Sequence, residues 1–198
     1  GALRGDAKEY VFSEPLDYGQ AVVQFKALYA FLGTKVNDSM RAGAHVHVNC
    51  LDLTIRELFT FITAYYCLQD LLTEDLGEER QGNFFCLRLS DADYASGAIQ
   101  QCLSDKTFSR NGVFNNAGLR YAALNLVSLS KFGSLEFRAM KTPQTADPLL
   151  QWVGLLKTLK HNATTLFKDP AELVNAMSAN GGGAVVKLLL GEYAEKQL

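Results

Sequence analysis

The sequence contains no run of lysines or arginines that would form a basic stripe, and its 19 basic and 21 acidic residues leave a net charge of −2. This balance argues against a protein whose main task is to grip nucleic acid, although small anionic ligands remain possible through local charge. No apolar run reaches the roughly 18 to 20 residues that span a bilayer. We therefore expect neither a nucleic-acid partner nor a membrane.

Cysteine is scarce, and its four residues are widely spaced without a Cys-x-x-Cys pair. Zinc ribbons and redox dithiols need such pairs, so the sequence predicts neither and favours a reducing, cytoplasmic setting. With 198 residues, of which 48% are hydrophobic, the chain can bury one full core. We expect a single domain over residues 1–198, in which residues 145–198 form a helical C-terminal part.

The spacing of apolar residues predicts an alternation of strands and helices. Strands are expected at residues 8–14, around His45 and His47, at 120–130 and at 134–140, the last two joined by a hairpin connection at 131–133. Helices are expected at residues 18–32, 54–72, 91–103 and 146–167, and from Pro170 and Ala184 onward. This order predicts an α+β domain with a largely antiparallel sheet, helices on one face and polar residues on the other.

Two segments far apart in the chain, RAGAHVHVN and SLEFR, place polar residues at every second position. Because strand side chains alternate between the two faces, His45 and His47 would project from one side of the first segment. Glu136 and Arg138 would likewise share one side of the second. Imidazole, carboxylate and guanidinium groups on one face are suitable for holding a divalent cation together with a polyphosphate.

Each of these residues also has a less specific explanation. A pair of strand histidines can simply hydrogen-bond within a sheet, and Glu136 and Arg138 can form a structural ion pair or an exposed edge. Buried imidazoles and charges without partners cost free energy, however, which favours a functional explanation in such apolar surroundings. Other polar residues, each of which alone would be a surface or turn residue, are further candidates: Glu9, Arg80, Asn83, Arg120 and Asn125.

Five motifs, taken in order, resemble the amidoligase family, a group of carboxylate–amine ligases related to glutamine synthetase. The motifs are GALR with EYVFSEPL, GAHVHV, RQGNFFC, RYAALN and LEFR, and they lie between Gly1 and Arg138. The resemblance implies a curved, largely antiparallel sheet like that of the glutamine synthetase catalytic domain. Its concave face would hold ATP and Mg²⁺ or Mn²⁺ ions.

The resemblance also implies a role for each candidate residue. The residues that look like metal ligands are Glu9, His45 and Glu136. Those that look like catalytic contacts to phosphate or acyl phosphate are Arg138 and Arg120. Those that look like cofactor-binding residues are His47, Arg80, Asn83 and Asn125.

The activity implied by this resemblance is ATP-dependent formation of an amide or peptide-like bond through an acyl phosphate. The substrates would be a small-molecule or peptide carboxylate and an amine. Members of the group usually carry an earlier strand with a Glu-x-Glu pair, whereas the sequence starts at Gly1, in the middle of a motif. We therefore expect an upstream segment, or a second chain, to complete the metal site.

Two other functions compete with the ligase. A strand His-x-His motif also occurs in metal-dependent hydrolases, but catalytic zinc generally needs three protein ligands, and the remaining histidine, His161, lies on an expected helix far along the chain. The other alternative is a non-catalytic interaction domain that keeps the ligase fold. The incomplete set of metal ligands is the best support for that alternative.

Overall fold

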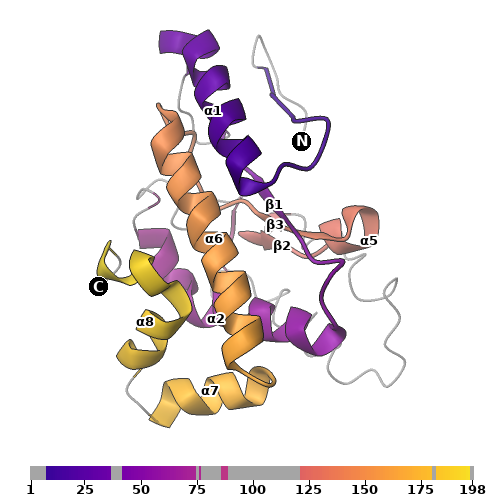
Figure 1. The fold of residues 1–198 in the computed structure, drawn as a ribbon, viewed down its shortest axis with the longest axis vertical. Coiled ribbons are helices and arrows are strands. Elements are labelled where there is room, and N and C mark those ends of the chain that lie inside the picture. Colours follow the sequence, from indigo (N-terminus) through magenta and orange to yellow (C-terminus); the bar gives the residue numbers. More distant parts are fainter. Residues whose placement is uncertain are drawn as a thin grey trace.

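The three-dimensional structure is a computed structural model that describes residues 8–36, 42–74, 76, 86–88, 121–179 and 182–196. The helices and strands are, in chain order, α1 (Tyr18–Leu32), η1 (Gly33–Lys35), β1 (Val46–Asn49), α2 (Ile55–Glu74), β2 (Leu124–Asn125), α5 (Ser128–Phe132), β3 (Ser134–Phe137), α6 (Ala146–Leu166), α7 (Pro170–Ala179), α8 (Gly183–Leu190) and η5 (Gly191–Lys196). The chain is therefore α+β, as predicted, and most of its described elements are helices (Figure 1).

The three strands form a small antiparallel sheet in the order β1-β3-β2. In its register, Val46 of β1 and Leu124 of β2 both lie opposite Phe137 of β3, while His47 and Asn125 both lie opposite Glu136. Because residues directly opposite one another share a face, the first row is apolar and the second is polar. The predicted alternation on the two distant segments is confirmed.

Helices cover the apolar face of the sheet. The ring of Phe137 packs against Phe61 and Tyr65 of α2 at centroid distances of 5.7 and 5.0 Å. Helix α6 contacts both α2 and β1, and α1 runs beside α6 (Figure 1). The largest fully buried side chains of α2 recur at three- and four-residue intervals, the spacing that keeps one helix face toward the core: Phe61, Tyr65, Leu68 and Leu72.

The predicted helix boundaries agree closely with the structure. Helix α1 begins after Asp17, whose side chain accepts a hydrogen bond from the Gln20 backbone N–H at 2.8 Å while the Gln20 side chain accepts one from the Asp17 backbone N–H. This reciprocal capping satisfies backbone donors that the first turn leaves unpaired. The predicted helices 54–72 and 146–167, and those starting at Pro170 and Ala184, correspond to α2, α6, α7 and α8.

The prediction of a strand at residues 8–14 is wrong. This segment is irregular, and Phe12 packs on Phe25 of α1 with a ring centroid distance of 5.3 Å. A strand requires a neighbour that accepts its backbone hydrogen bonds, and here the aromatic residue that suggested a strand contacts a helix instead. The abundance of aromatic residues was therefore a misleading signal for this segment.

The predicted hairpin between residues 120–130 and 134–140 is also wrong in its details. Strands β2 and β3 do pair, but α5 occupies most of the connection and β2 spans only Leu124–Asn125. Gly133 caps the end of α5 with a φ of +67°, a backbone conformation that residues with a Cβ disfavour. A Cβ at Gly133 would also collide with the Leu51 side chain.

The predicted helix at residues 91–103 lies outside the described residues. Among the described residues, no helix combines the length and the apolar character that crossing a membrane requires.

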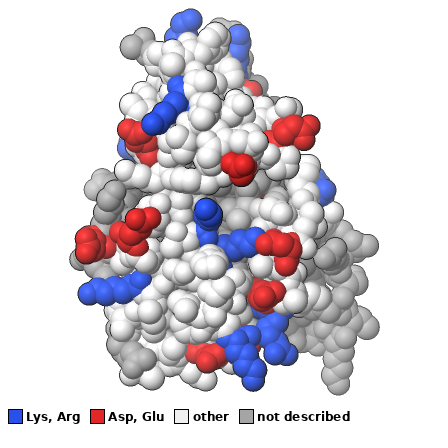
Figure 2. All heavy atoms as spheres, viewed as in Figure 1, with Lys and Arg blue, Asp and Glu red and all other residues white. Residues whose placement is uncertain are grey.

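On the face drawn in Figure 2, lysine and arginine side chains are interspersed with acidic ones.

Candidate functional site

The polar face of the sheet brings together residues that are almost 90 positions apart in the sequence. His47 of β1, Glu136 of β3 and Asn125 of β2 form one row across the three strands. His45 immediately precedes β1, and Arg138 immediately follows β3. The predicted convergence of imidazole, carboxylate and guanidinium groups is therefore observed.

Glu136 is the centre of this face, and one of its oxygens contacts two nitrogen groups. Oε1 lies 3.2 Å from His45 Nδ1 and accepts a hydrogen bond from Arg138 Nη1 at 2.7 Å. The Glu136 and Arg138 side chains are only 9% and 13% exposed, whereas that of His45 is 32% exposed. The His45 side is thus the more accessible side of this cluster.

The second oxygen of Glu136 is held from the β2 side of the sheet. Asn125 Nδ2 donates to Oε2 at 2.5 Å, and Ser128 Oγ of α5 donates to the same atom at 3.0 Å. Asn125 is itself fixed, because its Oδ1 accepts the backbone N–H of Val127 at 2.9 Å. Two buried donors on Oε2 therefore hold the Glu136 carboxylate in one orientation.

These contacts keep Glu136 ionised. Burial alone would raise the pKa of the Glu136 carboxyl group, but the hydrogen bond with His45, the positive charge of Arg138 and the hydrogen bond from Asn125 outweigh it. The pKa of Glu136 therefore lies well below its usual range. A buried carboxylate that stays charged is suitable for binding a cation.

His47 lies beside this cluster and has its own partners. Its Nδ1 is 3.0 Å from Ser134 Oγ, and its ring meets the edge of Phe132 at a centroid distance of 5.7 Å. Burial lowers the pKa of His47, Glu136 acts in the opposite direction, and the charges of His45 and Arg138 lower it further. The neutral imidazole is therefore favoured at neutral pH.

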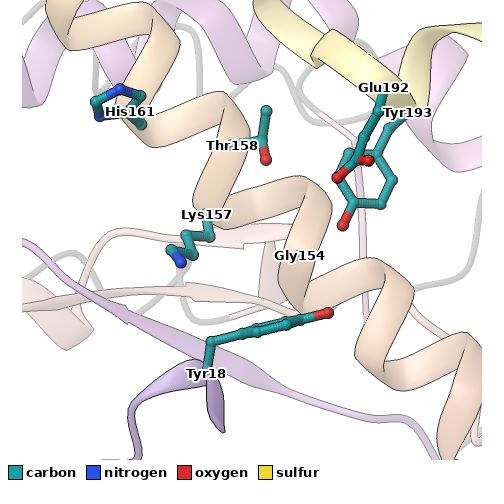
Figure 3. A pocket seen from close by; sticks show the side chains of 7 residues that line it. All are labelled: Tyr18, Gly154, Lys157, Thr158, His161, Glu192 and Tyr193. Atoms are coloured by element: carbon teal, nitrogen blue, oxygen red, sulfur yellow. The ribbon is translucent and has the colours of Figure 1, made fainter. Parts of the chain in front are cut away.

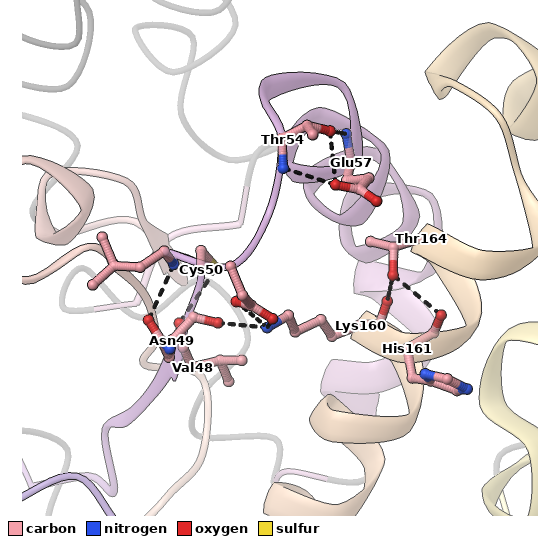
Figure 4. Close-up of polar contacts among 10 residues, drawn as sticks. Val48, Asn49, Cys50, Thr54, Glu57, Lys160, His161 and Thr164 are labelled. Atoms are coloured by element: carbon pink, nitrogen blue, oxygen red, sulfur yellow. Dashed lines mark hydrogen bonds and ion pairs between the residues drawn. The ribbon is translucent and has the colours of Figure 1, made fainter.

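The loop that follows β1 is tied to helix α6 (Figure 4). Lys160 Nζ donates to the backbone oxygen of Asn49 at 2.8 Å and contacts both carboxylate oxygens of Asp52 at 2.8 Å. The hydrogen bond that the Lys160 ammonium donates to the Asp52 carboxylate lowers the pKa of that carboxyl group. Helix α6 thereby fixes the end of the strand that carries the histidines.

Two of the predicted metal ligands, His45 and Glu136, lie 3.2 Å apart. The described residues contain no group of three or more His, Cys, Asp or Glu side chains that could hold an ion. Glu9, the third predicted ligand, is exposed on the irregular segment before α1 and does not form such a group with His45 and Glu136. Three other predicted residues lie outside the described residues: Arg80, Asn83 and Arg120.

Sequence reasoning missed Ser128, which contacts Glu136 directly. The residue falls inside the segment predicted to be a strand, and on a strand it would have faced the side opposite Asn125. The structure places it at the start of α5, where its hydroxyl turns back toward β3. Nothing in the local sequence signals that contact, because it depends on how α5 folds back on the sheet.

Comparison with known proteins supports the family that the motifs indicate. The model of the family described as "Putative amidoligase enzyme" matches residues 11–158, which include β1, β2, β3 and most of α6. No curated protein and no solved structure matches the chain. Since the match extends over most of the sequence and contains the whole Glu136 cluster, the chain belongs to the amidoligase family.

Proposed function

We propose that the protein is an ATP- and Mg²⁺-dependent carboxylate–amine ligase that forms an amide or peptide-like bond through an acyl phosphate. Mn²⁺ would serve in the same way as Mg²⁺. The observation that carries the proposal is the meeting of His45, Glu136 and Arg138 on one face of the sheet, within 3.2 Å of a shared carboxylate oxygen. Membership of the amidoligase family supports the same class of reaction.

The His45–Glu136 pair fits a divalent cation. Two neighbouring ligands of an octahedral ion with bonds of about 2.1 Å lie roughly 3.0 Å apart. The distance between His45 Nδ1 and Glu136 Oε1 is 3.2 Å. Mg²⁺ is commonly held by one or two protein ligands together with water and substrate phosphates, so a two-residue site suits an ion that arrives with ATP.

Arg138 is positioned to bind phosphate next to that ion. Its Nη1 already donates to Glu136, and the planar fork of a guanidinium can hold two phosphate oxygens at once. By family resemblance, Arg120 would contact phosphate or acyl phosphate as well. His47, Arg80 and Asn83 would contact the nucleotide or the substrate.

The structure leads us to revise the role proposed for Asn125. Its amide donates to Glu136 Oε2, its Oδ1 accepts a backbone N–H, and the residue is 4% exposed. We assign Asn125 and Ser128 as positioning residues that orient the Glu136 carboxylate. In this arrangement Oε1 is the oxygen that faces His45 and the open side of the cluster.

The reaction then requires a substrate carboxylate oxygen to attack the γ-phosphorus of ATP while ADP leaves. A divalent cation held by His45 and Glu136 would supply positive charge that lowers the charge on the phosphates. Arg138 would neutralise negative charge on the transferring phosphoryl group. Glu136 would keep the Arg138 guanidinium in position through their hydrogen bond. The amine nitrogen next attacks the acyl carbon, phosphate leaves, and the nitrogen loses a proton.

Several finer features belong to this proposal. The sheet would be the core of a glutamine synthetase-like catalytic domain, and Glu9 or residues of an upstream segment or second chain would supply further metal ligands. The substrates would be a small-molecule or peptide carboxylate and an amine. A reaction that consumes ATP fits the cytoplasmic setting expected from the cysteine pattern.

Hydroxylamine provides a test that does not require the natural amine. The chain would be incubated with ATP, Mg²⁺, hydroxylamine and a panel of amino acids, dicarboxylates and short peptides. An acyl phosphate reacts with hydroxylamine to give a hydroxamate, so we expect hydroxamate and phosphate to appear in equal amounts for the accepted carboxylate. His45→Ala and chelation by EDTA should each abolish both products.

A binding measurement decides between the ligase and a non-catalytic domain. A ligand that binds only the folded protein must raise its melting temperature, so Mg²⁺ with a non-hydrolysable ATP analogue should stabilise the chain, and His45→Ala should remove this effect. Absence of both hydroxamate formation and nucleotide-dependent stabilisation would favour the interaction domain. Tightly bound zinc without nucleotide binding would favour a hydrolase.

A further inference from the structure

A second group of polar side chains lines a hollow on helix α6, where α6 meets the start of α1 and the η5 turn (Figure 3). The hollow has a volume of about 220 Å³. Its lining residues are Tyr18, Gly154, Lys157, Thr158, His161, Glu192 and Tyr193. None of them belongs to the Glu136 cluster, so the proposed ligase function leaves this group unexplained.

Gly154 makes room for two tyrosine hydroxyls to converge. A Cβ at this position would collide with Tyr193 Oη and would lie 3.3 Å from Tyr18 Oη. The pKa of Tyr193 is raised by burial, by nearby Tyr18 and Glu192, and by a hydrogen bond with Tyr18. The Tyr193 hydroxyl thus stays neutral, and hydroxyl groups such as those of Tyr18 and Tyr193 can both donate and accept hydrogen bonds in the hollow.

Charges of opposite sign stand on different sides of this hollow. Lys157 projects from α6 with its Nζ 5.4 Å from the centre of the Tyr18 ring, while Glu192 projects from η5 beside Tyr193 (Figure 3). Within the described ranges, neither Lys157 nor Glu192 forms an ion pair. The hollow therefore presents one cation and one anion that do not neutralise each other.

This arrangement selects for a particular kind of ligand. A nucleotide or phosphate would bring several negative charges close to Glu192, and the described residues offer no group of three metal-ligating side chains here. A molecule with one carboxylate and one ammonium would satisfy both Lys157 and Glu192. At about 30 Å³ for each water molecule in the liquid, the hollow has room for roughly seven waters, which matches a ligand of similar heavy-atom count.

We propose that this hollow binds a small zwitterion of the amino-acid type. Its carboxylate would lie at Lys157, and His161, one helical turn further along α6, would lie on the same side. Its ammonium would lie at Glu192, and the hydroxyls of Tyr18, Thr158 and Tyr193 would bind between the two charges. The site is separate from the proposed ATP site, so its occupancy does not depend on ligase activity.

An NMR titration of the isotopically labelled full chain tests this proposal without ATP, metal ions or turnover. The probes are glycine, β-alanine and γ-aminobutyrate, which separate the two charges by increasing distances, with acetate and methylammonium as single-charge controls. We expect at least one zwitterion to cause saturable shifts at the amides of Gly154, Thr158 and Tyr193. The single-charge controls should not saturate these shifts over the same concentration range.

Charge-removing variants distinguish specific binding in the hollow from non-specific binding to the protein surface. Lys157→Gln and Glu192→Gln should each weaken zwitterion binding about tenfold or more, because each removes one charge contact of roughly 1.4 kcal/mol or above. The matched controls Lys187→Gln and Glu74→Gln should bind as the wild type does.

Three results would overturn the proposal: no saturable shift with any zwitterion, equal binding of acetate, or unchanged binding by both charge-removing variants. Failure of the ligase proposal would leave this titration unaffected, so the two can be distinguished.

Discussion

The two faces of the small sheet can be compared through two consecutive residues of β3. Glu136 is 7% exposed and Phe137 is fully buried, so both are removed from solvent to a similar degree. Phe137 lies against the aromatic rings of α2, where burial of apolar surface stabilises the fold. Glu136 lies among donors from four other residues, which are His45, Arg138, Asn125 and Ser128.

This difference shows that similar burial can have opposite energetic consequences. Burying Phe137 is favourable by itself, whereas burying a carboxylate is costly and is tolerated here because both oxygens have partners. A sheet that needed only stability could place an apolar residue at position 136. The cost of a charged residue at that position supports the binding role that we propose for the polar face, whereas the apolar face holds the fold together.

The largest expected effect comes from removing the charge of Glu136. We expect Glu136→Gln to lower ligase turnover on the order of 10³-fold, the size found when one electrostatic contact at a reacting centre is lost. The amide keeps the shape of the side chain, so the circular dichroism spectrum should match that of the wild type. Glu74→Gln, which alters an exposed carboxylate on α2, is the matched control and should retain full turnover. Unchanged turnover in Glu136→Gln would remove this residue from the active site.

The second-largest effect is expected on the apolar face of the sheet, at Phe137. We expect Phe137→Ala to lower the free energy of unfolding by about 3–5 kcal/mol, because it leaves a cavity against α2. Urea unfolding would measure the loss, with Phe31→Ala as the control. Phe31 is 77% exposed, and its truncation should change stability by no more than about 0.5 kcal/mol. A loss of turnover in Phe137→Ala without a loss of stability would contradict the division between the two faces.

Arg138→Lys should have a smaller effect than loss of the Glu136 charge. Lysine keeps the positive charge but cannot reproduce the planar fork, so we expect the loss of about one charged hydrogen bond, equivalent to a fall in kcat/KM for ATP of roughly 10- to 100-fold. Arg56→Lys, on the exposed start of α2, is the control and should leave kcat/KM unchanged. Near-normal kinetics in Arg138→Lys would mean that the guanidinium serves only to neutralise Glu136.

The lowered pKa of Glu136 predicts how the stability of the fold depends on pH in acid. A carboxyl group whose pKa is depressed in the folded state stabilises the fold above its unfolded pKa, which is about 4.3 for glutamate. That stabilisation is lost as the pH falls through the lowered pKa. The difference in urea midpoint between the wild type and Glu136→Gln should therefore be largest near pH 7 and should shrink below about pH 4. A difference that widens in acid would contradict the ionised state of Glu136.

The same comparison explains how much of the molecule the sequence could predict. Alternation of polar and apolar residues is local information, so the faces of His45, His47, Glu136 and Arg138 were predictable, as were helices with clear spacing such as α1. Which segment pairs or packs with which depends on residues far away in the sequence. The aromatic residues of segment 8–14 fit a strand, but Phe12 contacts Phe25 of a helix instead.

The partners of Glu136 beyond the strand pattern could not be predicted for a related reason. Ser128 contacts Glu136 only because α5 interrupts the expected hairpin and returns toward β3. The tie between Lys160 and Asn49 likewise joins residues 111 positions apart. Such contacts depend on the packing of whole elements, and no short sequence pattern encodes them.

The smallest effect is expected at Ser128, and it distinguishes positioning from simple packing. Ser128→Ala removes one of the two donors on Glu136 Oε2, so we expect a loss of about 1 kcal/mol in stability and a several-fold weaker apparent affinity for Mg²⁺ in the ATP reaction. Ser128→Thr keeps the hydroxyl and should restore the Mg²⁺ affinity. Ser178→Ala, which removes a hydroxyl bonded within α7, should not change it. If Ser128→Ala lost stability but kept wild-type Mg²⁺ affinity, the hydroxyl would contribute to the fold alone, and the orientation of Glu136 would depend on Asn125.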